Sequence, residues 1–343
     1  MHYISKNNFV KLLEALQADY EVYVPVKKDK QRFYKKFNQS SDNVVIGEVR
    51  AYEPLKAFFS RAREIVAEDF KTDKVPSSTN KPFAIVGVKA CDLKGFKVQD
   101  HVFTNHDYKD PFYIRNRQQN LIISADCTSA IETCFCMALG IQPYPRENFD
   151  INLSQGKEGF LVEVGSQKGE TLIDKHSSLF EEMPDEALSE RDGQRNWVAK
   201  KVEDNIKEND IPHQESYKGI IEKKYESDIW KDEAKTCVEC GACNTICPTC
   251  HCFLLYDQKS PQHMARLRIW DSCMIKDFAE VAGGANPRPK LWMRLRNRFE
   301  KKFDFFPKVA DIYACTGCGR CISACPAKID IRKVLKKLVG NAQ

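Results

Sequence analysis

The sequence contains no apolar run long enough to cross a membrane and no low-complexity tract, so neither a transmembrane helix nor a long disordered tail is expected. It also lacks a signal peptide, because Met1–Lys6 leads directly into an amphipathic segment. We therefore expect a reducing, cytoplasmic compartment, in which cysteines remain free thiols. A net charge of +5 in 343 residues is too small to indicate a nucleic-acid partner.

Cysteine is the informative residue type: there are fifteen, and eight of them form two runs with the same spacing. Each run has three cysteines at intervals of three, then a fourth cysteine four residues later that is followed by proline. The members are Cys237, Cys240, Cys243 and Cys247 in the first run, and Cys315, Cys318, Cys321 and Cys325 in the second. This is the ligand pattern of bacterial ferredoxins, which bind 4Fe–4S clusters.

The spacing also predicts how the two runs share their ligands. A tight C-x-x-C-x-x-C loop supplies three thiolates to one cluster, and the fourth cysteine of the run ligates the other cluster. We therefore predict a first thiol set on one 4Fe–4S cluster and a second thiol set on another. The first set is Cys237, Cys240, Cys243 and Cys325, and the second set is Cys315, Cys318, Cys321 and Cys247.

Two other kinds of metal site share part of this pattern. Zinc binds paired C-x-x-C motifs, but it needs four ligands and has no use for a fourth cysteine and proline repeated twice. Cys247-Pro-Thr-Cys250-His251 matches the C-x-x-C-H motif of covalent haem attachment, yet that site would take a ligand from the first run. Iron–sulfur ligation is the interpretation that uses all eight cysteines.

A length of 343 residues predicts two domains. Strand and helix patterns mix through residues 1–226, which predicts an α/β domain. Residues 227–343 are expected to form an all-α helical ferredoxin domain that carries both clusters. The two cysteine runs are 67 residues apart, more than a compact ferredoxin needs, and apolar positions at helical spacing predict a helix over Gln262–Ala282.

Periodicity and turn signals predict the elements of the α/β domain. Helices are expected over residues 5–18 and 55–68, a strand over Glu21–Val26 that pairs with 32–37 and 43–49, buried strands over Pro82–Val88 and Asn120–Ser124, a hairpin of 159–164 with 170–174, and polar helical sequence to about residue 226.

Four further cysteines, here called the third thiol set, lie on predicted loops of the α/β domain. Cys91 and Cys127 each follow a predicted buried strand, and Cys134 and Cys136 begin a helical turn. Because parallel strands deliver their loops to one edge of a sheet, the four thiols are candidates for a third 4Fe–4S cluster. The alternative is that some of them are buried apolar cysteines of the core.

Three cysteines remain, Cys250, Cys252 and Cys273. We expect them to pack beside a cluster or to donate weak S–H bonds to it, and a three-thiolate or mixed site with His251 is the alternative. A basic stretch with interleaved apolar residues follows over residues 288–303. It predicts basic side chains that offset the negative charge of a cluster, or a solvated amphipathic helix, or both.

Several motifs run in order from residue 83 to 326, and Tyr23-Val-Pro25 precedes them. They are Lys89-Ala-Cys91-Asp92, Cys134-Phe-Cys136, the first cysteine run continued through Cys250 and Cys252, Trp270-Asp-Ser-Cys273, Ala282-Gly-Gly284, Arg296-Asn-Arg298 and Cys315-x-Gly-Cys318-Gly-Arg-Cys321. In these motifs the chain resembles the β subunits of soluble NAD(P)-linked nickel–iron hydrogenases (sulfhydrogenases) and the iron–sulfur electron-transfer subunits of anaerobic sulfite reductases.

The resemblance implies that Cys91, Cys127, Cys134 and Cys136 occupy family cysteine positions and bind the third 4Fe–4S cluster. It also implies a partner subunit that carries flavin and reacts with NAD(P)H. The chain itself has no G-x-G-x-x-G motif, so we expect neither flavin nor NAD(P) to bind here.

The leading hypothesis is a non-catalytic, electron-transfer iron–sulfur subunit of a cytoplasmic multi-subunit oxidoreductase. It would relay electrons between the flavin- and NAD(P)H-reactive subunit and a catalytic subunit that is hydrogenase-like or sulfite-reductase-like. One alternative is a self-contained flavin-dependent iron–sulfur reductase. The other is a zinc-stapled interaction module without a redox role.

Overall fold

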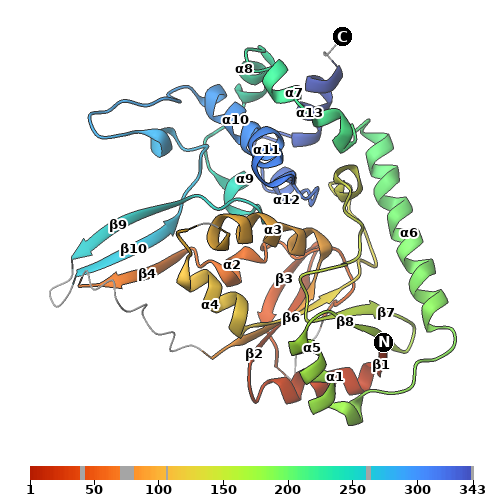
Figure 1. The fold of residues 1–343 in the computed structure, drawn as a ribbon. Coiled ribbons are helices and arrows are strands. Elements are labelled where there is room, and N and C mark those ends of the chain that lie inside the picture. The colour runs from red at the N-terminus through yellow and green to blue at the C-terminus, as the bar shows by residue number, and fades with distance from the viewer. Residues whose placement is uncertain (39–42, 70–80, 106, 260–263, 341–343) are drawn as a thin grey trace.

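The computed structural model describes residues 1–38, 43–69, 81–105, 107–259 and 264–340 (Figure 1). Its first part is built on a seven-stranded sheet with the order β1-β8-β7-β6-β5-β2-β3. The middle strands are parallel to one another, and antiparallel strands flank them on both sides. The strands are β1 (His2–Ser5), β2 (Glu21–Lys28), β3 (Gln31–Lys36), β5 (Phe83–Val88), β6 (Leu121–Ala125), β7 (Ile151–Gln155) and β8 (Gly159–Val164).

The central strands β5 and β6 are short apolar runs, and helices cover both of their faces. α1 (Lys6–Leu16) and α5 (Gln167–Lys175) pack on one face, and α3 (Ala90–Thr104) and α4 (Pro111–Gln119) pack on the other. Parallel strands need this double cover because their side chains on both faces are apolar. The expected mixture of strands and helices in the first part of the chain is confirmed.

Most local predictions for this part are confirmed. The predicted helix over residues 5–18 is α1, and the predicted pairing of residues 21–26 with 32–37 is the β2–β3 ladder. Polar sequence before residue 226 contains the long helix α6 (Ala187–Glu208). Residues 43–49 form only one isolated bridge, between Val26 and Val44, and no strand.

The predicted hairpin of residues 159–164 with 170–174 is wrong. β8 pairs with β1 and β7, while residues 170–174 lie in α5. That helix begins after Ser166, whose Oγ accepts a hydrogen bond from the backbone N–H of Gly169 at 3.2 Å. The N-terminal cap favours helix in a segment whose apolar residues fit either period.

The C-terminal part is mainly helical and lies beside α3, where α9 and α12 are its nearest helices (Figure 1). A π-helix (Lys301–Phe305) joins α10 to α11. The helices are α7 (Ile220–Lys223), α8 (Ile229–Ala234), α9 (Ala242–Thr245), α10 (Leu291–Glu300), α11 (Phe306–Ala310), α12 (Arg320–Ser323) and α13 (Ile331–Gly340). One hydrophobic cluster joins Trp230, Phe299 and Leu335 of this part to Phe135 and Leu139 of the first part, so a division of the chain at residue 226 stays a prediction.

The expectation that the ferredoxin domain is all-α is wrong. β9 (Phe253–Lys259) and β10 (Met264–Trp270) lie between the two cysteine runs and form a sheet with β4 (Arg63–Glu68), in the order β4-β10-β9. The helix predicted over residues 262–282 is therefore wrong in this respect, because the described residues of that segment include the strand β10. Its apolar residues also suit a strand, and pairing with β4, far away in sequence, decides between the two.

For the same reason the helix predicted over residues 55–68 is wrong beyond its first turn. The segment contains the short helix α2 (Lys56–Phe59) and then β4.

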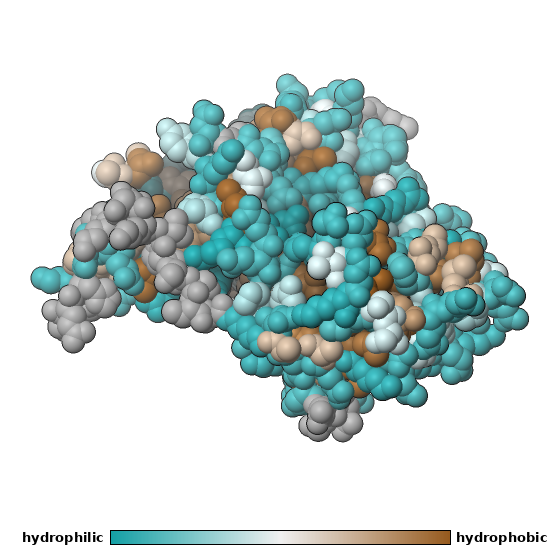
Figure 2. Space-filling view, turned by 60° about the horizontal axis from the view of Figure 1, so that its bottom comes forward, coloured by the Kyte–Doolittle hydropathy of each residue, from teal (hydrophilic) through white to brown (hydrophobic). Residues whose placement is uncertain are grey.

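No helix in the described residues is both long and apolar enough to span a membrane. The face seen in Figure 2 is mainly hydrophilic, with hydrophobic residues in separate small groups.

Candidate metal centres

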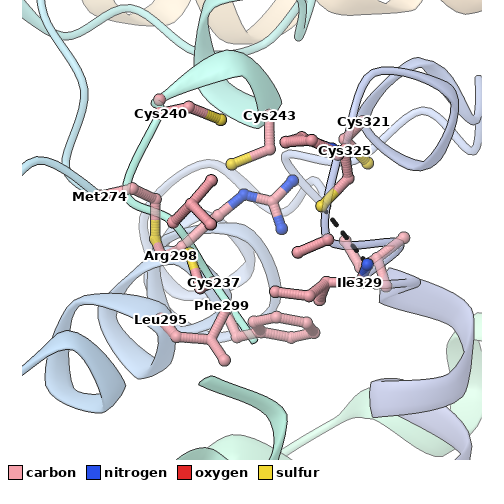
Figure 3. Close-up of a pocket in the computed structure, with 15 residues that line it drawn as sticks. Cys237, Cys240, Cys243, Met274, Leu295, Arg298, Phe299, Cys321, Cys325 and Ile329 are labelled. Carbon is pink, nitrogen blue, oxygen red and sulfur yellow. Dashed lines mark hydrogen bonds between the residues drawn. The ribbon is translucent and has the colours of Figure 1, made fainter. Parts of the chain in front are cut away.

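The first thiol set lines one cavity, as predicted (Figure 3). Cys237 and Cys240 come from the loop that leads into α9, Cys243 lies in α9, and Cys325 follows α12. The crossover of the fourth cysteine from the other run is therefore present in the fold. The Sγ atom of Cys325 accepts a hydrogen bond from the backbone N–H of Ile329 at 3.3 Å, the dashed line in Figure 3.

Apolar side chains form most of the remaining wall of this first cavity. Met274, Leu295 and Phe299 are buried there, and Phe299 packs on Trp230 with ring centroids 5.5 Å apart. One side of this cavity is open to solvent, at Cys240, which is the exposed member of the first thiol set. A cluster held here would be shielded from water on most sides and near the surface at Cys240.

The second thiol set is also brought together. Burial raises the pKa of Cys315; the charge of Lys302 opposes this effect, the neighbouring thiols Cys321 and Cys247 add to it, and the resulting pKa is about 12. Burial likewise raises the pKa of Cys321, with contributions from Cys318 and Cys247. Mutual electrostatic effects of this kind require the four sulfur atoms to lie close to one another.

Cys247 has the surroundings of a thiolate. Lys302 Nζ lies 3.4 Å from its sulfur, and also 2.9 Å from Thr249 Oγ1 and 2.8 Å from the Ala314 carbonyl oxygen. A hydrogen bond from Cys250 lowers the pKa of Cys247 well below its usual range; burial opposes this effect, and Lys302 adds to it. A depressed thiol pKa favours the deprotonated form that binds metal.

The third thiol set lines a second cavity, as the strand order predicts. Cys91 begins α3 directly after β5, and Cys127 follows β6, the adjacent parallel strand. Cys134 and Cys136 come from the next loop, and Cys136 starts a short 3₁₀ helix. Burial raises the pKa of all four thiols, that of Cys127 to about 12, so they remain protonated unless a metal displaces the protons.

The second and third thiol sets are in direct contact. Cys318 of the second set lines the third set's cavity. The backbone N–H of Phe135 donates to the carbonyl of Gly317 at 2.9 Å. Gly317 has φ +61°, and a Cβ placed on it would lie 2.5 Å from the Cα of Cys136. Only glycine therefore allows the loop of the second run to lie on the loop of the third set.

A fully buried ion pair fixes this contact. Arg320, from the second run, has no exposed side-chain surface and pairs with Asp92 at 2.7 Å, next to Cys91. Its Nε donates to the carbonyls of Ala51 and Tyr52, both at 3.1 Å. The second run is thus anchored inside the α/β part.

The thiols of the first and third sets surround cavities and do not converge on a point. Among the described residues, no group of three or more His, Cys, Asp or Glu side chains is arranged to hold a single metal ion. A 4Fe–4S core is wider than one ion and has a separate iron for each thiolate, so its ligands stand further apart. Cavities lined by four cysteines fit such a group.

Comparison with known proteins agrees with the geometry. Residues 236–329 match the family model of a 4Fe-4S dicluster domain. Over 341 residues the chain is 31% identical to sulfhydrogenase 2 subunit beta of Pyrococcus furiosus, and the match covers 98% of both proteins. The chain belongs to the sulfhydrogenase β-subunit family. The predicted family is therefore confirmed, and this member is an iron–sulfur protein of the oxidoreductase and electron-transport class.

In this sulfhydrogenase β-subunit family member, two of the three cysteines outside the sets, Cys250 and Cys273, lie beside the second and first sets. Cys250 hydrogen-bonds Cys247 of the second set. Cys273 Sγ accepts from Asn244 Nδ2 at 2.9 Å, next to Cys243. Cys252 lies 3.8 Å from Lys301 Nζ. That they only neighbour clusters stays a prediction.

Sequence reasoning missed most of the buried cations around the thiols. Lys89 is 1% exposed and donates to the carbonyls of Ile46 and Asp126, beside Cys127. Lys56 is buried and donates to the carbonyl of Cys250 at 2.9 Å. No local pattern marks these lysines, although Lys89 stands in a motif of the family resemblance. The basic stretch did signal Arg298 and Lys302, which are buried and not solvated.

Proposed function

We propose that this chain is the electron-transfer iron–sulfur subunit of a cytoplasmic multi-subunit oxidoreductase. A 4Fe–4S cluster accepts and releases one electron at a time. The chain's own residues hold such groups, exclude water from them and set their spacing. The chemistry at either end of the relay belongs to partner subunits.

The observation that carries this proposal is the contact between the thiol sets. The first and second sets share the two cysteine runs, and Cys318 of the second set also lines the cavity of the third. Cys321 of the second set lines the cavity of the first. Three sites in such a series suit electron relay, whereas a zinc-stapled module would need no adjacency between its metal sites.

The dicluster match supports two 4Fe–4S clusters, and we propose the first and second thiol sets as their ligands. We propose the third thiol set as the ligands of a third 4Fe–4S cluster. Its support is that four cysteines from three separate segments line one cavity beside Cys318. Scattered buried cysteines of a core would have no reason to share a cavity.

The partners are proposed from the relative. The Pyrococcus furiosus protein is named as a subunit of a sulfhydrogenase. We propose that the present chain likewise joins a catalytic subunit, hydrogenase- or sulfite-reductase-like, to a subunit that binds flavin and reacts with NAD(P)H. Cys240, the exposed ligand of the first set, and the third set at the opposite end of the series are the two places for electrons to enter or leave.

Iron analysis of the anaerobically reconstituted full chain tests the proposal. We expect about twelve irons per chain, or about eight if the third set is empty. Cys134→Ser should remove about four irons, keep the signals of the other two clusters and block electron transfer between partners. Cys273→Ser is the matched control and should keep all the iron. A wild-type chain with four irons or zinc would refute the relay, and unchanged iron and coupled activity in Cys134→Ser would refute the third cluster.

A further inference from the structure

Arg298 is a buried cation at the boundary of the first and second thiol sets. It lies on α10, is 5% exposed and lines the first cavity. Figure 3 shows its guanidinium pointing into that cavity, with the sulfur of Cys243 on one side and those of Cys321 and Cys325 on the other. Cys243 and Cys321 are also the two thiols that act most strongly on its charge.

Unlike its neighbours on the helix, Arg298 has no carboxylate partner among the described residues. Arg294 pairs with Glu239 at 2.8 Å, and Arg296 lies 3.9 Å from Glu226. In the described part of the chain Arg298 forms no ion pair; its Nε donates to Asn244 Oδ1 at 3.2 Å, and its Nη2 is buried without a hydrogen-bond partner. A buried guanidinium stays charged, so it needs a nearby anion to offset the cost of burial.

The thiol sets are the anions within reach. A 4Fe–4S core with four cysteine thiolates carries a net negative charge that increases on reduction, and hydrogen bonds to its sulfurs raise its potential. Cys243 belongs to the first set and Cys321 to the second. One guanidinium therefore serves two clusters.

We propose that Arg298 is a positioning residue for electron transfer, the shared counterion of the first and second clusters. This inference rests on the ligand assignment under Proposed function. When an electron passes between the two clusters, one is oxidised and the other reduced, so the total negative charge facing Arg298 is unchanged. A cation between the two clusters therefore stabilises either location of the electron, and its surroundings need little rearrangement.

Lys302 provides a comparison on the same helical segment. Its Nζ contacts Cys247, a ligand of the second set, and it does not line the first cavity. Its charge should therefore act mainly on the second cluster. Arg296 is the matched control, because it is 7% exposed but donates to the Tyr225 carbonyl at 2.9 Å and stacks on the Tyr225 ring.

The test is a redox titration of the reconstituted full chain, followed by electron paramagnetic resonance and paired with iron analysis. Cys237→Ser and Cys315→Ser identify which signal belongs to which cluster. Arg298→Gln should keep the iron and move the midpoints of both clusters to more negative potentials. Lys302→Met should move only the second, and Arg296→Gln neither. Unchanged midpoints in Arg298→Gln, or a shift of one cluster alone, would overturn the proposal.

If Arg298→Gln loses iron, Arg298→Lys decides, because it keeps the charge. Full iron content with midpoints close to wild type supports the shared counterion. Midpoints displaced from wild type despite the retained charge, or iron loss in both variants, mean that Arg298 is only structural, and the proposal fails. Failure of the ligand assignment itself is seen separately, as fewer than about eight irons in the wild-type chain.

Discussion

The buried ion pair between Asp92 and Arg320 gives the sharpest test of how the two halves of the chain are joined. Asp92→Asn keeps the shape of the side chain and removes its charge. Both partners have fully buried side chains, and Asp92 also accepts the backbone N–H of Leu55 at 3.1 Å. The change leaves Arg320 as a buried cation held by the carbonyls of Ala51, Tyr52 and Glu53.

Removing one partner of a buried pair costs about 3–5 kcal/mol. We expect the lower end, about 3 kcal/mol, because the sulfurs of Cys318 and Cys91 also lie near Arg320 and offset part of its charge when they bind metal as thiolates. Native-state hydrogen exchange measures this locally, without global unfolding of a protein that holds clusters. Amides of segments 50–55 and 317–323 should exchange on the order of 100-fold faster.

The control is Asp257→Asn, which breaks an exposed pair with Arg266 on the β9–β10 hairpin. Its side chains are 39% and 45% exposed, so this change should leave hydrogen exchange in both segments as in the wild type. A double change, Asp92→Asn with Arg320→Gln, should recover part of the stability by removing the unpaired charge. A loss below about 1 kcal/mol in Asp92→Asn would refute the claim that this pair anchors the second run.

Three further predictions follow from burial and close contact. Gly319→Ala should lower the free energy of unfolding by more than about 2 kcal/mol, because φ at this position is +69° and the new Cβ would overlap the Thr133 carbonyl. The control is Gly193→Ala, in open space on α6, which should stabilise the protein by about 0.5–1 kcal/mol. Burial lowers the pKa of His251 to about 4, below its value in the unfolded chain. The stabilisation is therefore complete above about pH 6.5 and is lost as the pH falls toward 4. Between pH 7 and pH 5.5, urea unfolding should show a loss of about 1 kcal/mol in the free energy of unfolding, and His251→Gln should not show this loss. Iron removal should make residues 227–343 protease-sensitive, and Leu139, in the same hydrophobic cluster, should lose protection with them.

Local spacing was enough to predict that Cys325 lies with the first three cysteines of the other run. Three cysteines at intervals of three can only form a tight loop, and that loop cannot supply its own fourth ligand, so the exchange of Cys247 and Cys325 follows from the sequence. The third set follows from a similar rule, because β5 and β6 are adjacent parallel strands whose following loops carry Cys91 and Cys127. The cavities lined by the first and third sets match these expectations.

Local spacing could not predict which distant strands pair, nor which face of a helix is buried. β10 becomes a strand because β4, about 200 positions earlier, pairs with it. The basic stretch fits either a solvated or a buried face, and the π-helix Lys301–Phe305 breaks the helical period on which that choice depends. Lys302, Phe303 and Asp304 are consecutive and all buried there, which no 3.6-residue pattern predicts.

The second cysteine run explains why the three thiol sets form a series. Its beginning contacts the third set, because Gly317 lies on Cys136 and Cys318 lines the third set's cavity. Its end contacts the first set, because Cys321 lines the first cavity and Cys325 is a member of that set. A run with contacts on both sides must be held rigidly in the middle, and Arg320, between Cys318 and Cys321, does this through its buried pair. The contacts of the second run on its two sides therefore set the spatial order third, second, first.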